Sequence, residues 1–323
     1  MNSFARPRVF ASKCLGFEAC RYNGVTIPVE YIEHLKPFCD FVTVCPEVEI
    51  GLGIPRDPIR IIEIEGRRYL YQPAKDKDYT KKMSRFTDHY LEGLTDIDGF
   101  ILKEKSPSCG LNKVKIYPGK GKVSPKAEKT SGFFGGAVRE RFPFAAIEDE
   151  GRLLNFKMRE HFYTKIFALA RFRKVSSTGA TSELVHFHAS HKLLLMASNQ
   201  KELRALGKIV ANPARKHFPD IITDYREHFH LALGNPARYT SHINVLQHAM
   251  GYFKNDLSPD EKTYFLDLLE QYRHAKLPLS ALISVIRSWI TRFSQPYLAD
   301  QVYFKPYPWE LATISDSGKG RNL

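Results

Sequence analysis

The sequence predicts two domains of different fold class, an α/β domain over residues 1–150 and an all-helical domain over residues 151–323. In the first part, short apolar runs alternate with helical segments, and this alternation predicts a mostly parallel sheet. Strand-like runs largely end after Gly151. A chain of 323 residues is also long enough to bury two separate cores.

The first domain contains three short apolar runs that we expect to form strands, at residues 9–11, 41–44 and 99–102. Residues 79–94 are expected to form a helix, because apolar residues recur there at intervals of three and four, beginning with Met83. Each of the three strands leads into a turn rich in Gly, Pro or Ser. If the strands are neighbours in one parallel sheet, their carboxyl ends converge, and ligands bind in the crevice there.

The second domain shows helix signals in place of strands. Residues 258–261, Ser-Pro-Asp-Glu, predict a helix start, with Ser258 as the N-cap and Glu261 completing a capping box. The histidines of this domain are expected to make core or interhelix hydrogen bonds, and the alternative is RNA contact by a histidine, Asn244, Gln247 or Tyr252. Metal binding is not favoured, because no carboxylate has ligand-like spacing with the histidines. The apolar stripe expected to be buried after this helix start is Phe265, Leu268, Leu269 and Tyr272.

Each of the three strand-end turns holds one cysteine, namely Cys14, Cys45 and Cys109. Three soft thiolates favour an iron-sulfur cluster or zinc over a hard cation. Three cysteines on a 4Fe-4S cluster would leave one iron without a protein ligand, and substrate chemistry can take place at such an open position. The pattern therefore predicts a metal or cluster site at the edge of the sheet.

Two alternatives for these cysteines stay open. A buried free cysteine is common as a small apolar side chain. A structural zinc site would need a fourth ligand, which Cys20, Cys39 or a histidine would have to supply. For Cys20 we expect packing first, with a sulfur relay or a redox-active neighbour as alternatives, and for Cys39 we expect a place in the core.

The motifs around these cysteines resemble the thiouracil desulfidase family over roughly residues 5 to 150. The resemblance implies a 4Fe-4S cluster held by three cysteines, whose free iron takes sulfur from a thiolated pyrimidine. Mapped by motif, the ligands are Cys14, Cys45 and Cys109. The stretches that carry the resemblance are residues 12–16 (SKCLG), 20–24 (CRYNG), 45–48 (CPEV), 51–56 (GLGIPR) and 102–110 (LKEKSPSCG).

The rest of the chain, about residues 155 to 312, resembles a helical domain family of formerly unknown function. Its marks are residues 188–197, 242–253, 295–298 and 306–308. The fusion of the two resembles the tRNA 4-thiouridine desulfidases, which return 4-thiouridine to uridine. The resemblance implies tRNA as partner and water as co-substrate, with no obligate protein partner.

The chemistry expected for such a site needs an open iron, a base for water and a hydrogen-bonding side chain. A thiocarbonyl sulfur binds a thiophilic iron, which then acts as a Lewis acid and not as an electron carrier, so that water can attack the carbon. Glu47 is the candidate base, and its alternatives are to cap the turn or to pair with Arg56. Ser106 and Ser108, of which we favour Ser108, are candidates to hydrogen-bond the substrate, a cluster sulfide or only the turn backbone.

The chain is basic, with a formal net charge of +13 and a pI near 9.4. Residues 1–150 hold 24 Lys and Arg against 21 Asp and Glu, whereas residues 151–323 hold 24 against 14, which gives +3 and +10. The helical domain is therefore expected to bind the RNA.

Candidate RNA contacts lie in two basic stretches. One follows Cys109 and is kept out of regular structure by glycines and a proline; the other precedes a polar loop at residues 176–182. The alternative for these residues is a solvated surface. The candidates are Lys113, Lys115, Lys120, Lys122, Arg171, Arg173 and Lys174. Lys103 and Lys105 are further candidates for a phosphate or for lowering a thiol pKa, or else a solvated pair.

The sequence also predicts where the protein works. The first residues lack the apolar core of a signal peptide, and no apolar run approaches the ~20 residues of a membrane span, so we expect a cytoplasmic protein with no membrane contact. Five cysteines in a reducing compartment argue against a disulfide framework.

Two other functions remain possible from the sequence. The first is desulfuration of free thiouracil or its nucleoside, with the helical domain as an interaction module. The second is a non-enzymatic, cluster-bearing RNA binder or redox sensor.

Overall fold

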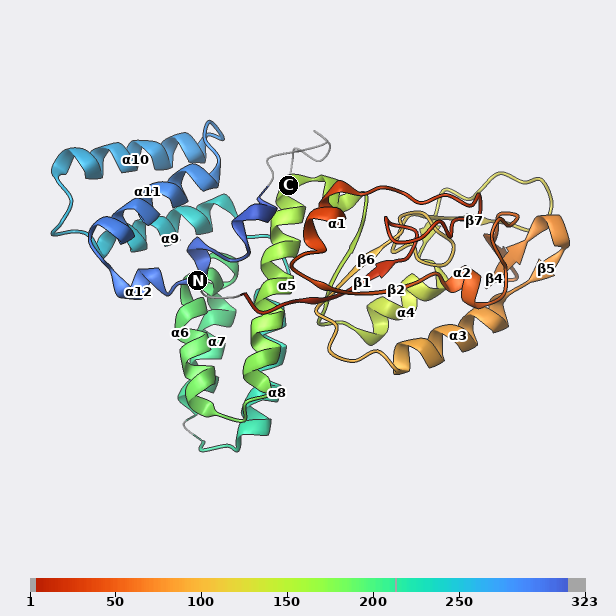
Figure 1. Ribbon diagram of the computed structural model, residues 1–323, viewed down its shortest axis with the longest axis horizontal. Coiled ribbons are helices and arrows are strands. Elements are labelled where there is room, and N and C mark those ends of the chain that lie inside the picture. The colour runs from red at the N-terminus through yellow and green to blue at the C-terminus, as the bar shows by residue number, and fades with distance from the viewer. Residues whose placement is uncertain (1–3, 213, 313–323) are drawn as a thin grey trace. The chain divides into compact units, whose positions relative to one another are not determined.

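The computed structural model describes residues 4–212 and 214–312. The chain forms two compact units, the first made of Met1–Ala170 with Pro308–Leu323 and the second of Arg171–Tyr307 (Figure 1). The first unit thus continues past residue 150, where the sequence pattern placed the boundary.

A four-stranded parallel sheet forms the centre of the first unit, in the order β2-β1-β6-β9. The predicted α/β fold class is confirmed, and the three predicted strands are neighbours, with β1 between β2 and β6. Residues 9–11 of β1 are fully buried, which is typical of a central parallel strand covered on both faces. The strands are β1 (Arg8–Ser12), β2 (Asp40–Val44), β6 (Gly99–Leu102) and β9 (Ala146–Asp149).

A second sheet of five strands belongs to the same unit, in the order β5-β4-β3-β7-β8. The sequence reasoning missed this sheet and wrongly left Lys115 outside regular structure, whereas residues 118–128 are irregular as expected. Lys115 lies in β7, and its neighbours Val114 and Ile116 are buried, so the segment alternates as a strand does. The glycines and the proline that follow obscured this short pattern. The strands are β3 (Arg60–Ile64), β4 (Arg67–Gln72), β5 (Lys77–Asp78), β7 (Val114–Tyr117) and β8 (Lys129–Thr130).

Aromatic side chains fill the core of the first unit. The ring centroid of Phe10 in β1 lies 5.4 Å from that of Phe100 in β6 and 5.5 Å from that of Phe134 in a following helix. The helix predicted at residues 79–94 is present as α3, with Met83 buried. The helices of this region are α1 (Glu30–Leu35), α2 (Pro46–Glu49), α3 (Thr80–Glu92) and α4 (Phe133–Arg141), with short 3-10 turns η1 (Pro73–Lys75), η2 (Arg152–Leu154) and η4 (Trp309–Leu311).

Helix α5 (Phe156–Ser176) explains why the first unit extends beyond residue 150. A β-carbon added at Gly99 would lie 2.7 Å from the Ile166 side chain and 3.2 Å from the Phe162 ring. The first part of α5 therefore packs directly against the backbone of β6, and both side chains are buried. A domain ending at residue 150 would lack this cover.

The second unit is helical, as the sequence predicts. The capping box at Ser258 and Glu261 is present, and the stripe after it is buried except for Tyr272, which is half-buried. His191 is fully buried, and the His242 ring bonds the Tyr303 hydroxyl at 2.8 Å, so both have the expected core role. The elements are α6 (Thr181–Ser198), α7 (Gln200–Ala211), α8 (Phe218–Ala232), α9 (Tyr239–Gly251), α10 (Pro259–Arg273), α11 (Leu279–Arg292), α12 (Pro296–Ala299) and η3 (Val302–Phe304).

Among the described residues, no helix has the length and apolar character needed to cross a membrane.

Candidate active site

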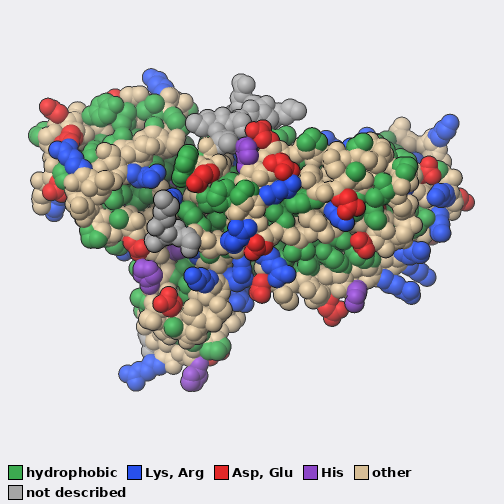
Figure 2. Space-filling view, in the orientation of Figure 1, with side chains coloured by type: hydrophobic (Ala, Val, Ile, Leu, Met, Phe, Trp, Pro, Cys, Tyr) green, Lys and Arg blue, Asp and Glu red, His purple; other side chains and the backbone are tan. Residues whose placement is uncertain are grey.

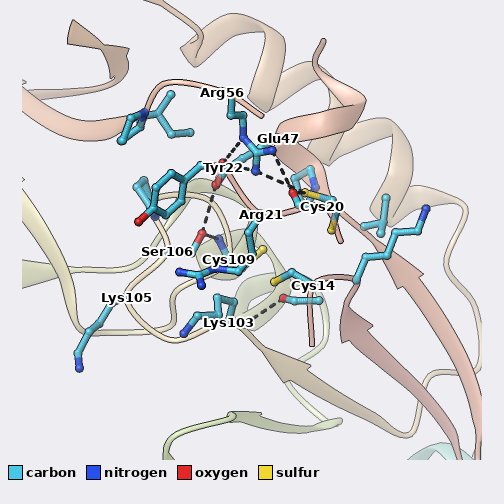
Figure 3. Close-up of a pocket in the computed structure, with 18 of the residues that line it drawn as sticks. Cys14, Cys20, Arg21, Tyr22, Glu47, Arg56, Lys103, Lys105, Ser106 and Cys109 are labelled. Atoms are coloured by element: carbon cyan, nitrogen blue, oxygen red, sulfur yellow. Dashed lines mark hydrogen bonds and ion pairs between the residues drawn. The ribbon is translucent and has the colours of Figure 1, made fainter. Parts of the chain in front are cut away.

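A cavity of about 360 Å³ lies at the carboxyl ends of β1, β2 and β6 (Figure 3). Cys14, Cys45 and Cys109 all line it, so the structure brings the three predicted cysteines together. The sheet register explains why. Ser12, the last residue of β1, pairs with Val44, the last residue of β2, and both strands therefore release their turns at the same edge.

The first two cysteines are fixed by backbone hydrogen bonds to other segments and by a helix start. The Lys13 amide donates to the Val44 carbonyl at 3.1 Å, and the Ile27 amide donates to the Cys14 carbonyl at 2.8 Å. Cys45 is the N-cap residue of α2, with Pro46 in the first helical position, where its missing N–H costs nothing. Each thiol thus leaves its strand in a defined direction.

The third cysteine is held by a turn that packs against the start of α4. The Ser106 hydroxyl accepts hydrogen bonds from the amides of Ser108, at 3.2 Å, and Cys109, at 3.1 Å. The Gly135 amide donates to the Ser108 carbonyl at 2.9 Å. A β-carbon at Gly135 would lie 2.4 Å from the Cys109 carbonyl oxygen, so this approach requires glycine.

A fourth thiol, Cys20, lies in the same cavity (Figure 3). Its side chain is fully buried, as expected for packing, but it is also in hydrogen-bonding contact with the thiols of Cys14 and Cys45. The contact with Cys14 is the main reason that the pKa of Cys20 is raised to about 11. The contact with Cys20 in turn raises the pKa of Cys45, and burial raises that of Cys109.

Within the described residues, no three Cys, His, Asp or Glu side chains are grouped as ligands of a single metal ion. The thiols surround a cavity instead.

The carboxylate of Glu47 is held on both of its oxygens. Arg56, whose side chain is 3% exposed, approaches Oε2 with Nε at 2.9 Å and Nη2 at 2.8 Å. The Ser108 hydroxyl donates to Oε1 at 2.9 Å, and the Ser106 hydroxyl lies 3.4 Å from the same oxygen. Glu47 therefore pairs with Arg56, the alternative considered from the sequence, and still lines the cavity.

The two serines have different positions. Ser106 lines the cavity, whereas Ser108 is fully buried behind it. The Ser108 hydroxyl is therefore placed to orient Glu47 and not to touch a ligand. This differs from the sequence-based preference for Ser108, because only the folded turn decides which of the two hydroxyls faces inward.

The sequence reasoning missed two residues at the cavity wall, Arg21 and Tyr22 (Figure 3). The Arg21 guanidinium carbon lies 5.4 Å from the centroid of the Tyr22 ring, which is 43% exposed. The Arg21 side chain makes no hydrogen bond or ion pair with any residue that the structure describes. The sequence signal that could have identified these two residues is a cation followed by an aromatic residue directly after Cys20.

Comparison with known proteins agrees with this site. Residues 9–150 match the family described as 2-thiouracil desulfurase. The first part of the chain belongs to that family. Residues 192–308 match a second family, a protein of unknown function called DUF1722.

Two curated relatives and one solved structure are similar to the chain. "Uncharacterized protein YbgA" of Escherichia coli (strain K12) is 31% identical over 146 residues, which are 45% of this chain and 86% of YbgA. "Uncharacterized protein YbbK" of Bacillus subtilis (strain 168) is 36% identical over 111 residues, 32% of this chain and 72% of YbbK. The structure titled "[4Fe-4S]-dependent thiouracil desulfidase TudS" is 26% identical, with a TM-score of 0.36 over 46% of this chain and 93% of TudS.

The lysines near the desulfurase-family cavity are mostly engaged with carboxylates. Lys103 lines the cavity and pairs with Glu150. Lys105 lies 3.5 Å from Glu104, and Lys113 lies 2.8 Å from the same residue. These lysines therefore bring little unpaired charge to the cavity.

The other predicted RNA contacts are spread over both units. Lys120 pairs with Asp76 at 2.9 Å, and Lys115 and Lys122 are exposed. In the second unit, half-buried Arg171 donates to the Pro306 carbonyl at 2.8 Å, Arg173 is half-buried and Lys174 is exposed.

Cys39 lies in the core, as expected, and burial raises its pKa.

The close packing at Gly135 gives a direct test of how Cys109 is held. Gly135→Ala should push the 106–110 turn away from α4, lower the thermal unfolding midpoint, and expose Cys109, which is 6% exposed in the native protein. Alkylation of Cys109 by iodoacetamide, followed by mass spectrometry, should become faster. Gly119→Ala is the control, because nothing lies within 4 Å of its added β-carbon. Equal rates in both variants would contradict this packing.

Proposed function

We propose that the protein removes sulfur from 4-thiouridine in tRNA, giving uridine and hydrogen sulfide with water as co-substrate. The observation that carries this proposal is the single cavity lined by Cys14, Cys45, Cys109 and the carboxylate of Glu47. Membership of the 2-thiouracil desulfurase family supports the class of reaction.

The donor set of the cavity fits an iron-sulfur cluster. Its thiols are soft ligands, and they surround a space instead of meeting at one point, as ligands of several irons would do. Cys14, Cys45 and Cys109 would hold a 4Fe-4S cluster, each from a different strand end. Such a cluster supplies, when bound, an iron without a protein ligand that can act as a Lewis acid on thiocarbonyl sulfur.

Glu47 is the group that handles the proton. Its Oε2 is occupied by Arg56, whereas Oε1 accepts from Ser108 at 2.9 Å and from Ser106 only at 3.4 Å, so a water molecule can take the place of the long Ser106 contact. Glu47 takes the proton of the water that attacks the ring carbon, and the Ser106 hydroxyl at the cavity wall is placed to orient that water or the substrate. In the net reaction, the carbon–sulfur bond breaks, a carbon–oxygen bond forms, and sulfur leaves with two protons.

The cavity wall suits a pyrimidine nucleotide. The exposed Tyr22 ring offers a stacking surface for an unpaired base, and the unpaired Arg21 cation suits a phosphate. A base buried in folded tRNA must be extruded to reach this site, which costs a few kcal/mol that backbone and pocket contacts recover. The +10 charge of residues 151–323 supports RNA recognition by the helical unit.

The substrate is tested by the near-ultraviolet absorbance of 4-thiouridine in tRNA. Protein purified anaerobically and reconstituted with iron and sulfide should abolish this absorbance, and a Cys109→Ala variant should leave it. High salt should slow the reaction on tRNA, because RNA binding weakens steeply with salt. Turnover of free thiouracil without any loss of absorbance in tRNA would contradict the proposal and favour nucleobase salvage.

The role of Glu47 is tested by Glu47→Gln. This variant should turn over roughly 10²- to 10⁴-fold more slowly, the usual contribution of a general base, while its bound iron stays at the native level. Glu49→Gln is a matched control, because Glu49 is an exposed residue of the same short helix. Native turnover in Glu47→Gln would remove Glu47 from the chemistry, and absence of turnover in the native protein itself would favour a cluster-bearing sensor.

A further inference from the structure

Three exposed cations lie together on helix α3 of the desulfurase-family unit: Lys81, Lys82 and Arg85. None of them makes a side-chain hydrogen bond or an ion pair within the residues the structure describes. We propose that this face of α3, here called the α3 basic face, binds the phosphate backbone of RNA. The proposal rests on the proposed function, since it names where the tRNA substrate contacts the catalytic unit.

The arrangement of these charges does not stabilise helix α3 itself. Lys81 and Lys82 are in the first turn of α3, where the helix dipole favours anions, and that turn has no acidic residue. Lys81 and Arg85 are four residues apart, so two like charges are neighbours on one face. A bound polyanion would relieve both repulsions.

The acidic residues around the α3 basic face do not neutralise it. Asp78, just before the helix, accepts a hydrogen bond from the Thr80 amide at 2.8 Å. Asp88 and Glu92 lie in the second half of α3, beside His89, and neither forms an ion pair with any described residue. The positive charge is therefore concentrated at the first half of the helix.

A fourth cation, on the neighbouring helix α4, extends the α3 basic face. Arg141 in the last turn of α4 donates to the Asp88 carbonyl at 3.3 Å and is exposed, so it lies beside α3. Figure 2 shows Lys and Arg side chains gathered over the position of α3 in this view. Phosphate contacts made by Lys and Arg fix the register of a nucleic acid without reading its sequence.

Three lysines in the basic stretch after Cys109 contrast with this face. Lys113 pairs with Glu104, Lys120 with Asp76 and Lys126 with Glu63. A lysine already paired with a carboxylate contributes less net attraction for a phosphate. Lys115 and Lys122 also form no ion pair among the described residues, but α3 carries three such cations on one helix, a grouping that the charge count along the chain could not show.

The α3 basic face belongs to the same compact unit as the cavity. The buried Met83 of α3 packs in one cluster with Ile50 and Leu52, which follow α2 and its Glu47. A backbone held on α3 is thus held by the unit that carries the thiols. No large apolar side chain of α3 is exposed, so the face lacks the anchor that a membrane-surface helix uses.

The test compares two triple variants in the full-length protein. Lys81→Gln, Lys82→Gln and Arg85→Gln together should weaken binding of unmodified tRNA roughly tenfold, and lower the slope of log affinity against log salt by about two to three. The matched triple, Lys113→Gln, Lys120→Gln and Lys126→Gln, should have a smaller effect. Fluorescence anisotropy between 50 and 200 mM salt measures both, and circular dichroism checks that each variant is folded.

Each outcome decides the proposal. Native tRNA affinity in the α3 triple, or a larger loss in the matched triple, would overturn it. Loss of binding to phosphatidylserine vesicles with unchanged tRNA binding would also overturn it and assign the face to a membrane surface. Turnover of free 4-thiouridine by the loaded enzyme should be unchanged in the α3 triple. If the native protein turns over no thiopyrimidine, the proposed function fails, whereas the tRNA-binding result still decides the role of α3.

Discussion

The site depends on the parallel adjacency of β2, β1 and β6. Ser12 pairs with Val44 and Ala11 with Ile101, so the three strands end at one edge and their turns meet there. Cys14, Cys45 and Cys109 are far apart in the sequence, and only this register places their thiols around one cavity. A shift of one residue in any of the strands would turn its side chains to the opposite face. The cavity therefore depends on the order and register of the strands in this sheet.

The second constraint is the buried pair of Glu47 and Arg56. With the Arg56 side chain 3% exposed and that of Glu47 14% exposed, removing either partner would leave a poorly solvated charge, at a typical cost of about 3–5 kcal/mol. Arg56 also donates to the Cys20 carbonyl at 3.0 Å and lies 3.8 Å from the Cys45 sulfur. One guanidinium thus links the carboxylate to the thiols, and the proposed base and the proposed cluster ligands keep a fixed relation.

Local patterns in the sequence were sufficient for the fold class, three of the four strands of the first sheet, and the turns that carry the cysteines. They failed where the outcome depends on residues distant in the chain. The second sheet pairs β3 with β7 across some 50 residues, and Lys113 and Lys120 meet carboxylates that no spacing rule connects to them. Whether Ser106 or Ser108 faces the cavity is decided by the contact of their turn with α4. Side-chain partners of this kind exist only in the folded chain.

The central claim is that the three strand-end thiols hold the cluster and that Cys20, although it touches two of them, does not. The most direct measurement is the iron bound after anaerobic reconstitution by Ala variants of each of these four cysteines, with the absorbance of the cluster recorded beside it. The account predicts that the Cys14, Cys45 and Cys109 variants lose most of their iron, while Cys20→Ala stays near the native level. Loss of iron in Cys20→Ala with retention in any of the other three would contradict it.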